Sequence, residues 1–339
     1  MHTIIEAVKR KYESSDLKTP DFYVWFNEVS PMISTPSSVP SHLTEATRPQ
    51  EIYGVEREEV YESYLNQFER DLEAFLKCRD VEMVKGGIMA LLIPALPAYW
   101  DPQTEFTVAS VIELLRSSLV DMAKKGRLSE TNLDAFNFPC YIPTPEQVWA
   151  ILQKSNSFSI ERNEILKSGT LLTVDGHFFF MDSKDNRHFS MNGRDGIHSY
   201  VKNSSYQKGV LETAKAIIEE EIATKLDIST NTFFGIADFG CSTGNNSFPA
   251  MHTIIEAVKR KYESSDLKTP DFYVWFNDVV SNDFNTLLNS LPPDRSYEVY
   301  AVPGGFRRYL LPPSSVHFAY YAWSLHWLSE GLKSLIWRE

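Results

Sequence analysis

The stretch FFGIADFGCSTGNN, residues 233–246, decides the fold. Its opening apolar run, Phe233–Ala237, predicts a short buried strand. The segment from Asp238 to Asn246 is rich in glycine and small polar residues, which predicts a tight turn. Apolar residues then recur at helical spacing at Ile254, Ile255, Val258 and Tyr262. Strand, glycine-rich turn and helix in this order are typical of a parallel α/β sheet, which binds ligands at the carboxyl ends of its strands.

The glycine turn and the strand after it predict a nucleoside-type cofactor. Gly240 and Gly244 allow a ligand to approach the backbone, and Asp238 opens the turn. A second strand, Asp271–Phe276, leads to Asp278, whose carboxylate can accept hydrogen bonds from both ribose hydroxyls. The dinucleotide fingerprint has a third glycine and an acid about 20 residues further on. Here GCSTG lacks that glycine and Asp278 lies 34 positions beyond Gly244, which favours S-adenosylmethionine (AdoMet) over NAD.

The alternative reading of the same residues is structural. Gly240 and Gly244 could simply make a tight strand-to-helix turn, and Asp278 could be a solvated loop acid. The placement of an acid at the tip of the second strand favours the nucleoside site over this alternative.

Strands and helices alternate in the first half of the chain as well. A long amphipathic helix is predicted over Val60–Leu76, with a solvated acidic face, and a buried strand over Ile88–Leu96. Another helix ends at Lys124, Lys125 and Gly126, and Thr144 fits the N-cap of a third. The predicted fold class is therefore α/β, with a doubly wound, Rossmann-like sheet and helical cap segments.

Composition excludes two classes of partner. The 339 residues carry 33 Lys and Arg against 45 Asp and Glu, a formal net charge of -12. Such a charge repels nucleic acids and anionic membrane surfaces, so neither is an expected partner. The three cysteines form no disulfide or metal-ligand pattern, which favours a reducing cytosol. Residues 1–11 have an amphipathic helical pattern in place of a signal peptide, so we expect a cytoplasmic protein.

An exact repeat divides the chain. Residues 1–27, MHTIIEAVKRKYESSDLKTPDFYVWFN, recur unchanged as residues 251–277, with different flanks. A solenoid is rejected, and a recent duplication, a fused gene model and an engineered chain stay open. The first copy has no glycine turn before it, so we expect one cofactor site at most. The predicted organisation is the first copy at 1–27, a linker at 28–50, a segment with a strand and cap helices at 51–180, and a cofactor and acceptor segment at 190–330.

An aromatic run near the end of the chain predicts a pocket wall. Two tryptophans, two tyrosines and two histidines fall within eleven positions. A buried strand cannot readily supply hydrogen-bond partners for so many side-chain polar groups. Aromatic rings also suit a sulfonium cation. The candidate substrate residues from this run are Tyr320, Trp323, His326 and Trp327. A carboxylate acceptor with a pKa near ~4 is already ionised at neutral pH, so no catalytic base is needed.

Several motifs of the chain resemble the SABATH family of plant methyltransferases, which transfer the methyl group of AdoMet to small carboxylic acids or ring nitrogens. The motifs are MNGRDGIHSYVKNSSYQKG at 191–209, ADFGCSTGNN at 237–246, FNDVVSNDFNTLL from Phe276, VPGGF from Val302 and WSLHWLS at 323–329. Residues 52–166 resemble the later half of the family, which would follow Ser329 in family order. The chain therefore resembles such an enzyme with its halves rearranged. Residues 170–188 do not resemble the closing hairpin of that sheet, so we expect the hairpin to be missing and a strand edge to be exposed.

The resemblance implies particular contacts for AdoMet, a small carboxylic acid acceptor and a homodimer. The implied cofactor contacts are Tyr200, Cys241, Asn246, Asp278, Val279, Gly305 and Phe306. The implied acceptor contacts are Gln207, Trp323, His326 and Trp327. Gly305 stands where the family often has serine, and Trp323 where tyrosine is commoner. Some family members bind Mg2+ near an Asp-x-Phe-Asn motif, matched here by Asp134, Phe136 and Asn137, without a clear partner asparagine before Ile52.

Three functions follow in order of preference. The first is an AdoMet-dependent methyltransferase acting on a small aromatic or terpenoid acid. The second is an inactive or unstable product of a rearranged locus, which at most binds AdoMet or a related chain, and the exact repeat favours it. The third is a nicotinamide-dependent dehydrogenase, which the glycine spacing disfavours.

Overall fold

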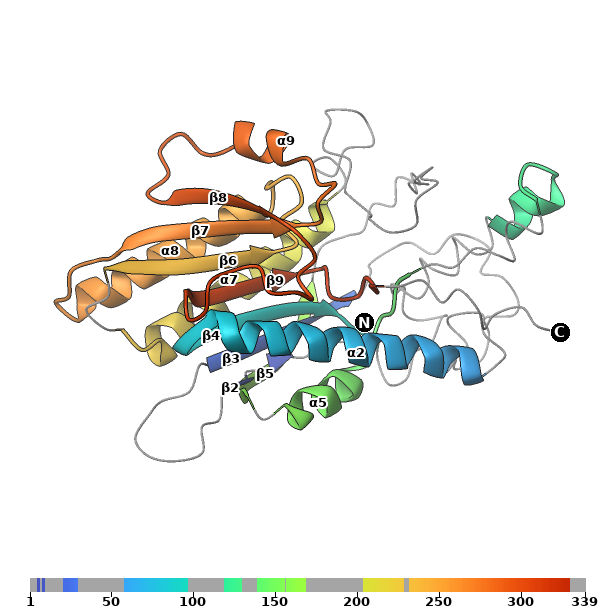
Figure 1. The fold of residues 1–339 in the computed structure, drawn as a ribbon, viewed down its shortest axis with the longest axis horizontal. Helices are drawn as coiled ribbons and strands as arrows, with labels where there is room; N and C mark the ends of the chain where they lie inside the picture. Colours follow the sequence, from blue (N-terminus) through green and yellow to red (C-terminus); the bar gives the residue numbers. More distant parts are fainter. Residues whose placement is uncertain are drawn as a thin grey trace.

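The computed structural model describes residues 5–6, 8–9, 21–29, 58–96, 119–129, 139–155, 157–168, 204–228 and 232–329. Two sheets and the helices on their faces make up this part of the chain (Figure 1).

The larger sheet has five strands in the order β4-β9-β6-β7-β8. Every neighbouring pair in it is parallel. The predicted α/β class is therefore confirmed. Its strands are β4 (Met83–Pro94), β6 (Phe233–Phe239), β7 (Asp271–Asp278), β8 (Glu298–Pro303) and β9 (Val316–Ala322).

The order of these strands is that of a doubly wound sheet. Counted along the chain from β6, the strands β6, β7, β8 and β9 take positions one to four of the order 3-2-1-4-5. The fifth position, beside β9, is filled by β4, which precedes all the others in the sequence. In the register of β6 with β7, Phe239 lies opposite Asn277, so the two strands end side by side.

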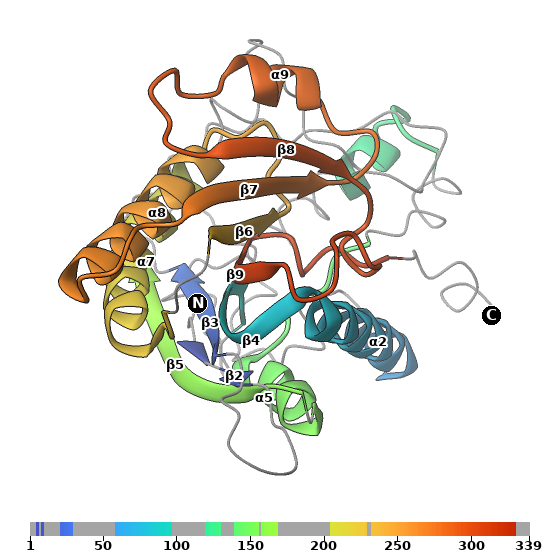
Figure 2. The same cartoon turned by 60° about the vertical axis from the view of Figure 1, so that its left-hand side comes forward.

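Helices cover the sheet on two faces (Figure 2). Strand residues alternate between the faces: Ile236 and Val274 belong to one buried cluster, and Ala237 and Phe239 to the other. On the first face lie α7 (Ser205–Lys225) and α8 (Ser247–Ser264), and on the second α2 (Glu58–Glu82) and α5 (Pro145–Lys154). A short helix, α9 (Phe284–Asn289), follows β7.

The sequence predicts several of these elements correctly. The helix expected from Val60 to Leu76 is α2, the strand expected from Ile88 lies within β4, and both begin earlier than the pattern suggested. The expected helix end at Gly126 is confirmed, because Gly126 has a left-handed φ of 66°.

One expectation about the N-terminal copy is wrong. Residues 5–6 and 8–9 form the short strands β1 (Ile5–Glu6) and β2 (Val8–Lys9), where an amphipathic helix was expected. The same residues in the second copy lie in α8, which starts from the glycine turn and buries Ile254, Ile255 and Val258. The same sequence thus forms strands in one copy and a helix in the other, so tertiary context overrides the helical pattern.

Among the described strands, β4 pairs only with β9 and stands last in the five-stranded sheet, so the sheet ends at β4 with the unpaired edge that the sequence predicts. The strand β3 (Asp21–Val29) runs alongside β4 but pairs in parallel with β5 (Ser159–Ser168), in a second sheet of order β1-β3-β5-β2.

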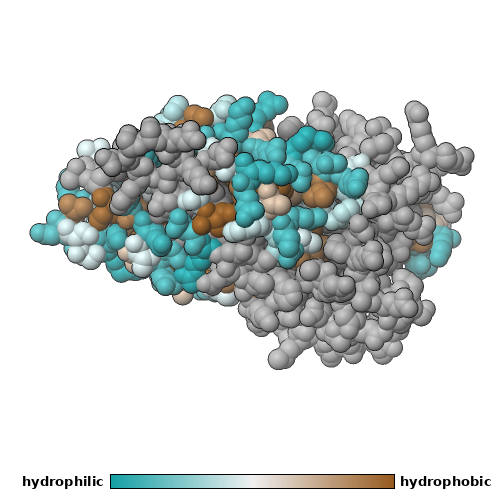
Figure 3. Space-filling view, turned by 90° about the horizontal axis from the view of Figure 1, so that it is seen from below, coloured by the Kyte–Doolittle hydropathy of each residue, from teal (hydrophilic) through white to brown (hydrophobic). Residues whose placement is uncertain are grey.

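Surface character fits a folded domain. On the face in Figure 3, hydrophobic residues of the described part form small groups among hydrophilic ones. Within the described ranges, no helix combines the length and the apolar character that crossing a membrane requires.

The N-cap of α5 supports the first stability prediction. The Thr144 hydroxyl accepts a hydrogen bond from the Gln147 amide at 3.4 Å, and Gln147 Oε1 accepts one from the Thr144 amide at 2.8 Å. The capping box expected at Thr144 is thus confirmed. Thr144→Ala is expected to lower the free energy of unfolding by about 1 kcal/mol, measured by chemical denaturation. Thr213→Ala, at an exposed position within α7, is the control and should change it by less than about half as much. Equal effects of the two substitutions would contradict the prediction.

Candidate functional site

The glycine turn lies where β6 ends, beside the end of β7. The Gly240 and Cys241 amides donate hydrogen bonds to the Asn277 carbonyl, at 2.8 and 3.0 Å. Gly240 has a φ of 91°, and a Cβ atom there would lie 2.2 Å from Ser324 Oγ. Only glycine fits this position, because the backbone is left-handed and the space for a side chain is already filled.

Asp278 fixes the other side of the turn. Its Oδ2 accepts a hydrogen bond from the Ser242 amide and its Oδ1 one from the Val279 amide, each at 2.7 Å. Asn282 Nδ2 donates to the Ser242 carbonyl at 2.7 Å. Burial raises the pKa of Asp278, and the two backbone hydrogen bonds oppose that rise. Each carboxylate oxygen still has capacity for a further donor, so the acid can hold a ligand.

A small cavity lies beside this turn. Its volume is about 30 Å³, room for one or two water molecules. Four of its lining residues are predicted cofactor contacts: Asp238, Gly240, Cys241 and Asn246. Three are predicted acceptor contacts: Gln207, Tyr320 and Trp323. The structure therefore brings the two predicted sets of residues together around one space.

Asp238 is the most perturbed acid at this place. It is 2% exposed at the end of β6, and its Oδ2 has no hydrogen-bond partner among the described residues. Burial, together with repulsion from Asp278, raises the pKa of Asp238 to about 7, although a hydrogen bond with Ser247 opposes the rise. A buried carboxylate with an unused oxygen is a place for a cationic or hydrogen-bond-donating ligand group.

Further buried polar atoms around the turn lack partners within the described part of the chain. They are Gln207 Oε1, Ser242 Oγ, Thr243 Oγ1, Asn277 Oδ1 and Asn282 Oδ1. Buried polar groups in folded proteins are nearly always hydrogen-bonded, so a cluster of unsatisfied ones needs a ligand or water to explain it. The cluster surrounds the carboxyl ends of β6 and β7, where a doubly wound sheet binds ligands.

Only part of the aromatic run lines the cavity, and the rest packs behind the lining residues. Trp323 lies in the cavity wall with a φ of 59°, and its amide donates to the Leu92 carbonyl at 3.0 Å. His326 and Trp327 do not line the cavity. The His326 ring lies 6.2 Å from the Trp323 ring and 5.2 Å from the Trp327 ring. Burial lowers the pKa of His326 to about 3, so its imidazole is neutral at neutral pH.

Other predicted cofactor residues lie away from the cavity. Val279 is half-buried directly after Asp278. Gly244 has a φ of 90° and sits against the Phe248 ring, so its role in the structure is to form the turn. Gly305 is exposed, with open space where a Cβ would lie, so a serine would fit there. The Phe306 ring packs against Phe75 and Tyr321 in the core, which leaves its backbone for any ligand contact.

Some predicted residues lie outside the described ranges. These are Tyr200 and the three residues of the metal motif, Asp134, Phe136 and Asn137. Among the residues that are described, no group of three His, Cys, Asp or Glu side chains could hold a metal ion.

Four lining residues of the cavity were not predicted: Leu92, Leu211, Ser247 and Ala322. Leu92 comes from the apolar strand β4, whose sequence carries no sign that its end reaches a ligand site. Ser247 could have been found, since it follows Asn246 at the start of the helix after the turn.

A larger cavity, of about 600 Å³, lies at the opposite ends of the strands. It is lined by residues at the start of β7 and before β8, among them Lys259, Asp271 and Arg295. Lys259 is already paired with Glu256 at 2.8 Å, and Arg295 is exposed and bonds the Pro292 carbonyl. This open groove has one buried unsatisfied polar atom among the described residues, the Tyr297 hydroxyl, whereas a cluster of such atoms surrounds the smaller cavity. We therefore assign the site to the carboxyl ends of β6 and β7.

A family model gives an independent comparison for these features. The model of the SAM dependent carboxyl methyltransferases matches residues 33–177 and 186–337.

Individual relatives match smaller parts of the chain. Loganic acid O-methyltransferase of Catharanthus roseus is 50% identical over 151 residues, 43% of this chain and 40% of that protein. Farnesoic acid carboxyl-O-methyltransferase of Arabidopsis thaliana is 44% identical over 159 residues, 44% of this chain and 46% of that protein. A solved structure of loganic acid methyltransferase with SAH is 51% identical, covers 41% of each chain and has a TM-score of 0.40. The chain thus spans less than half the length of the relatives it matches.

Proposed function

Because the chain belongs to the family of SAM-dependent carboxyl methyltransferases, we propose that it binds AdoMet at the carboxyl ends of β6 and β7. We propose further that it transfers the methyl group of AdoMet to the carboxylate of a small acid. The observation that carries this proposal is the cluster of buried, unsatisfied polar atoms around the glycine turn, with Asp238 on one side and Asp278 on the other.

The residues present suit AdoMet in charge and in hydrogen bonding. Asp238 offers an unused, buried carboxylate oxygen to the α-ammonium group, and Asp278 offers acceptors to the ribose hydroxyls. The glycine turn leaves no Cβ between the ligand and the backbone at Gly240. The described cavity of about 30 Å³ can take only one end of AdoMet, so binding of the whole molecule must widen it.

The proposed methyl transfer requires no catalytic base from the protein. AdoMet supplies a methyl group on a positively charged sulfur, which a carboxylate oxygen can attack in line. A small carboxylic acid is ionised at neutral pH, so a base is not required. The contribution of this chain is then to orient the acid and exclude water, with Gln207 as a polar contact and Trp323, Tyr320 and Leu92 as apolar walls.

We propose that the acid is small and largely apolar. The wall residues on the acceptor side are mainly hydrophobic, which suits an aromatic or terpenoid skeleton with one carboxylate. Relatives are named for loganic, farnesoic and benzoic or salicylic acid, compounds of this kind. A cytosolic location and a homodimer complete the proposal; the first is supported by three unpaired cysteines.

We also propose that the halves of the enzyme are in rearranged order. The support is topological: β4 fills the fifth position of the sheet although it precedes β6 in the chain. The exact repeat at both ends of the intervening segment favours the second candidate function, an inactive product of a rearranged locus.

Calorimetric titration of the purified chain with AdoMet tests the proposal. Binding in the micromolar range, followed by methyl transfer from labelled AdoMet to one of a panel of small acids, is the expected result. AdoMet binding without transfer to any acid would favour the inactive product. A folded chain that does not bind AdoMet would overturn the proposed function and would leave the inactive product as the candidate.

A further inference from the structure

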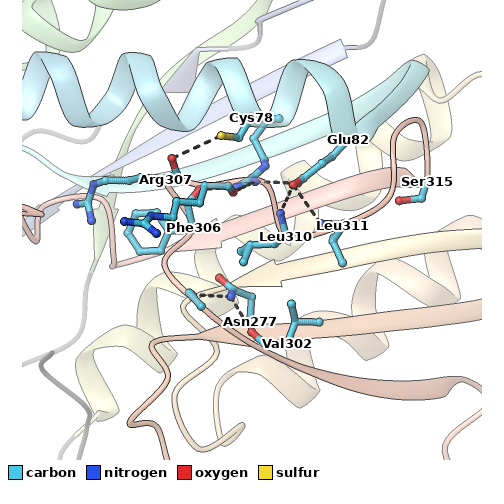
Figure 4. A network of polar contacts seen from close by, with 12 residues as sticks. Cys78, Glu82, Asn277, Val302, Phe306, Arg307, Leu310, Leu311 and Ser315 are labelled. Carbon is cyan, nitrogen blue, oxygen red and sulfur yellow. Dashed lines mark hydrogen bonds and ion pairs between the residues drawn. The ribbon is translucent and has the colours of Figure 1, made fainter.

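A buried ion pair lies at the end of α2, outside the residues assigned to the site. Arg79 Nη2 lies 2.7 Å from Glu82 Oε2, and neither side chain is exposed to solvent. Figure 4 shows the Glu82 side chain reaching from α2 to Leu310 and Leu311 in the loop after β8. Burying two charges costs several kcal/mol per ion, so further hydrogen bonds must compensate.

Those hydrogen bonds all go to one loop. Arg79 donates to the Phe306 carbonyl at 2.8 Å and to the Arg308 carbonyl at 3.1 Å. Glu82 Oε1 accepts from the Leu310 amide at 2.5 Å and from the Leu311 amide at 3.1 Å. The pair therefore satisfies four backbone groups of residues 304–311, a segment without helix or strand of its own.

Arg79 also contacts the glycine turn. Its guanidinium lies over the Phe239 ring, 4.1 Å from the centroid, and Phe239 directly precedes Gly240. One side chain thus touches both the end of β6 and the loop after β8.

Asn277 connects the same two segments from the opposite side. Its Nδ2 donates to the Val302 carbonyl at 2.7 Å and to the Gly304 carbonyl at 2.9 Å, while its own carbonyl accepts from Gly240 and Cys241. Asn277 therefore holds the beginning of the loop, and the ion pair holds the rest of it.

We infer that Arg79 and Glu82 are positioning residues that order the loop 304–311 and, through it and Phe239, hold the AdoMet site in its binding geometry. This inference rests on the proposed function. A pair that only stabilised the fold could be replaced by apolar side chains at little cost. A pair that positions the loop cannot, because four backbone groups would lose their partners.

Two double variants separate these roles. Arg79→Met with Glu82→Met removes both charges and the acceptor for Leu310 and Leu311. Arg79→Met with Glu82→Gln removes both charges but keeps an amide oxygen at that place. Hydrogen exchange of the unliganded chains should show at least tenfold faster exchange of the Leu310 and Leu311 amides in the first variant and near-parental exchange in the second. AdoMet affinity, measured by calorimetry, should fall about tenfold or more in the first variant and less in the second.

Ile151→Ala is the control for loss of stability alone. Ile151 is buried in α5, and its apolar side chain makes none of the hydrogen bonds that hold the loop, so its substitution should lower the melting temperature and leave AdoMet affinity unchanged. Parental AdoMet affinity in the Met/Met variant, or a loss that Ile151→Ala reproduces at equal melting temperature, would overturn the inference. A parental chain that binds no AdoMet would overturn the proposed function and the link to the cofactor, while the exchange data would still show whether the pair orders the loop.

Discussion

Replacement of Asp278 by alanine is expected to weaken AdoMet binding by a factor of about 100 or more. Hydrogen bonds to a charged group contribute about 1.5–3 kcal/mol each, and tenfold in affinity corresponds to about 1.4 kcal/mol. The substitution removes the proposed acceptor for the ribose hydroxyls and also takes away the partner of the Ser242 and Val279 amides. Calorimetric titration of the variant at neutral pH measures the effect.

Asp271→Ala is the matched control for Asp278→Ala. Asp271 stands at the other end of the same strand and is exposed, so its loss changes the net charge equally without touching the turn. Its AdoMet affinity should equal that of the parent. Unchanged binding by Asp278→Ala, in a sample with a cooperative melting transition, would remove the main support for the assigned site.

Substitution of Asp238 by asparagine is expected to stabilise the unliganded protein at alkaline pH and to impair its function. Burial raises the pKa of Asp238 from its ordinary value of 3.8 to about 7 in the fold, so folding favours its protonated form. The stability that this group contributes is present at low pH and is lost as the pH rises through 7. Asparagine is neutral throughout. The free energy of unfolding of Asp238→Asn, relative to that of the parent, should therefore rise by about 3 kcal/mol between pH 5 and pH 8, at 1.36 kcal/mol for each unit of pKa.

The same substitution should remove a pH dependence of binding. In the parent, AdoMet affinity should fall below pH 7, because the protonated acid no longer attracts an ammonium group. Asp238→Asn should bind AdoMet weakly and with little response to pH. Asp294→Asn, at an exposed loop position, controls for the change of charge and should follow the parent in both experiments. If the free energies of unfolding of Asp238→Asn and the parent differed by the same amount from pH 5 to pH 8, the expected ionisation of Asp238 would be refuted.

Sequence reasoning predicts residues that the structure brings together where local pattern and chemistry coincide. Gly240 and Asp278 are found because a glycine turn between an apolar strand and an amphipathic helix has few other uses, and the acid follows the next strand. The capping box at Thr144 is found for a similar reason, since its two partners are three residues apart. The site residues that lie in β6, β7 and α8 share one continuous stretch of chain, which makes their proximity predictable.

Contacts between distant segments are not predictable in this way. Arg79 and Glu82 look like ordinary charges near the end of an amphipathic helix, and only the tertiary packing of the loop after β8 buries them. Leu92 reaches the cavity because β4 pairs with β9, a partner more than 200 positions away. The strand β3 was not expected as a neighbour of β4, because its sequence is that of β7 and gives no information on which strands it will meet.

The two identical segments are also synthesised at different times. Residues 1–27 leave the ribosome 250 positions ahead of residues 251–277, a lead of roughly 12 to 50 s at about 5–20 residues per second. In the last part of this interval, between the synthesis of Phe239 and of Asp271, β6 is complete and β7 has not been made, for roughly 2 to 6 s at about 5–20 residues per second. The N-terminal DFYVWFN segment is already present at that time. Folding steps that depend on long-range strand pairing take about milliseconds to seconds, so the early copy has time to occupy the side of β6 that β7 later needs. We expect the yield of correctly assembled protein to depend on the speed of translation, and not only on the stability of the final fold.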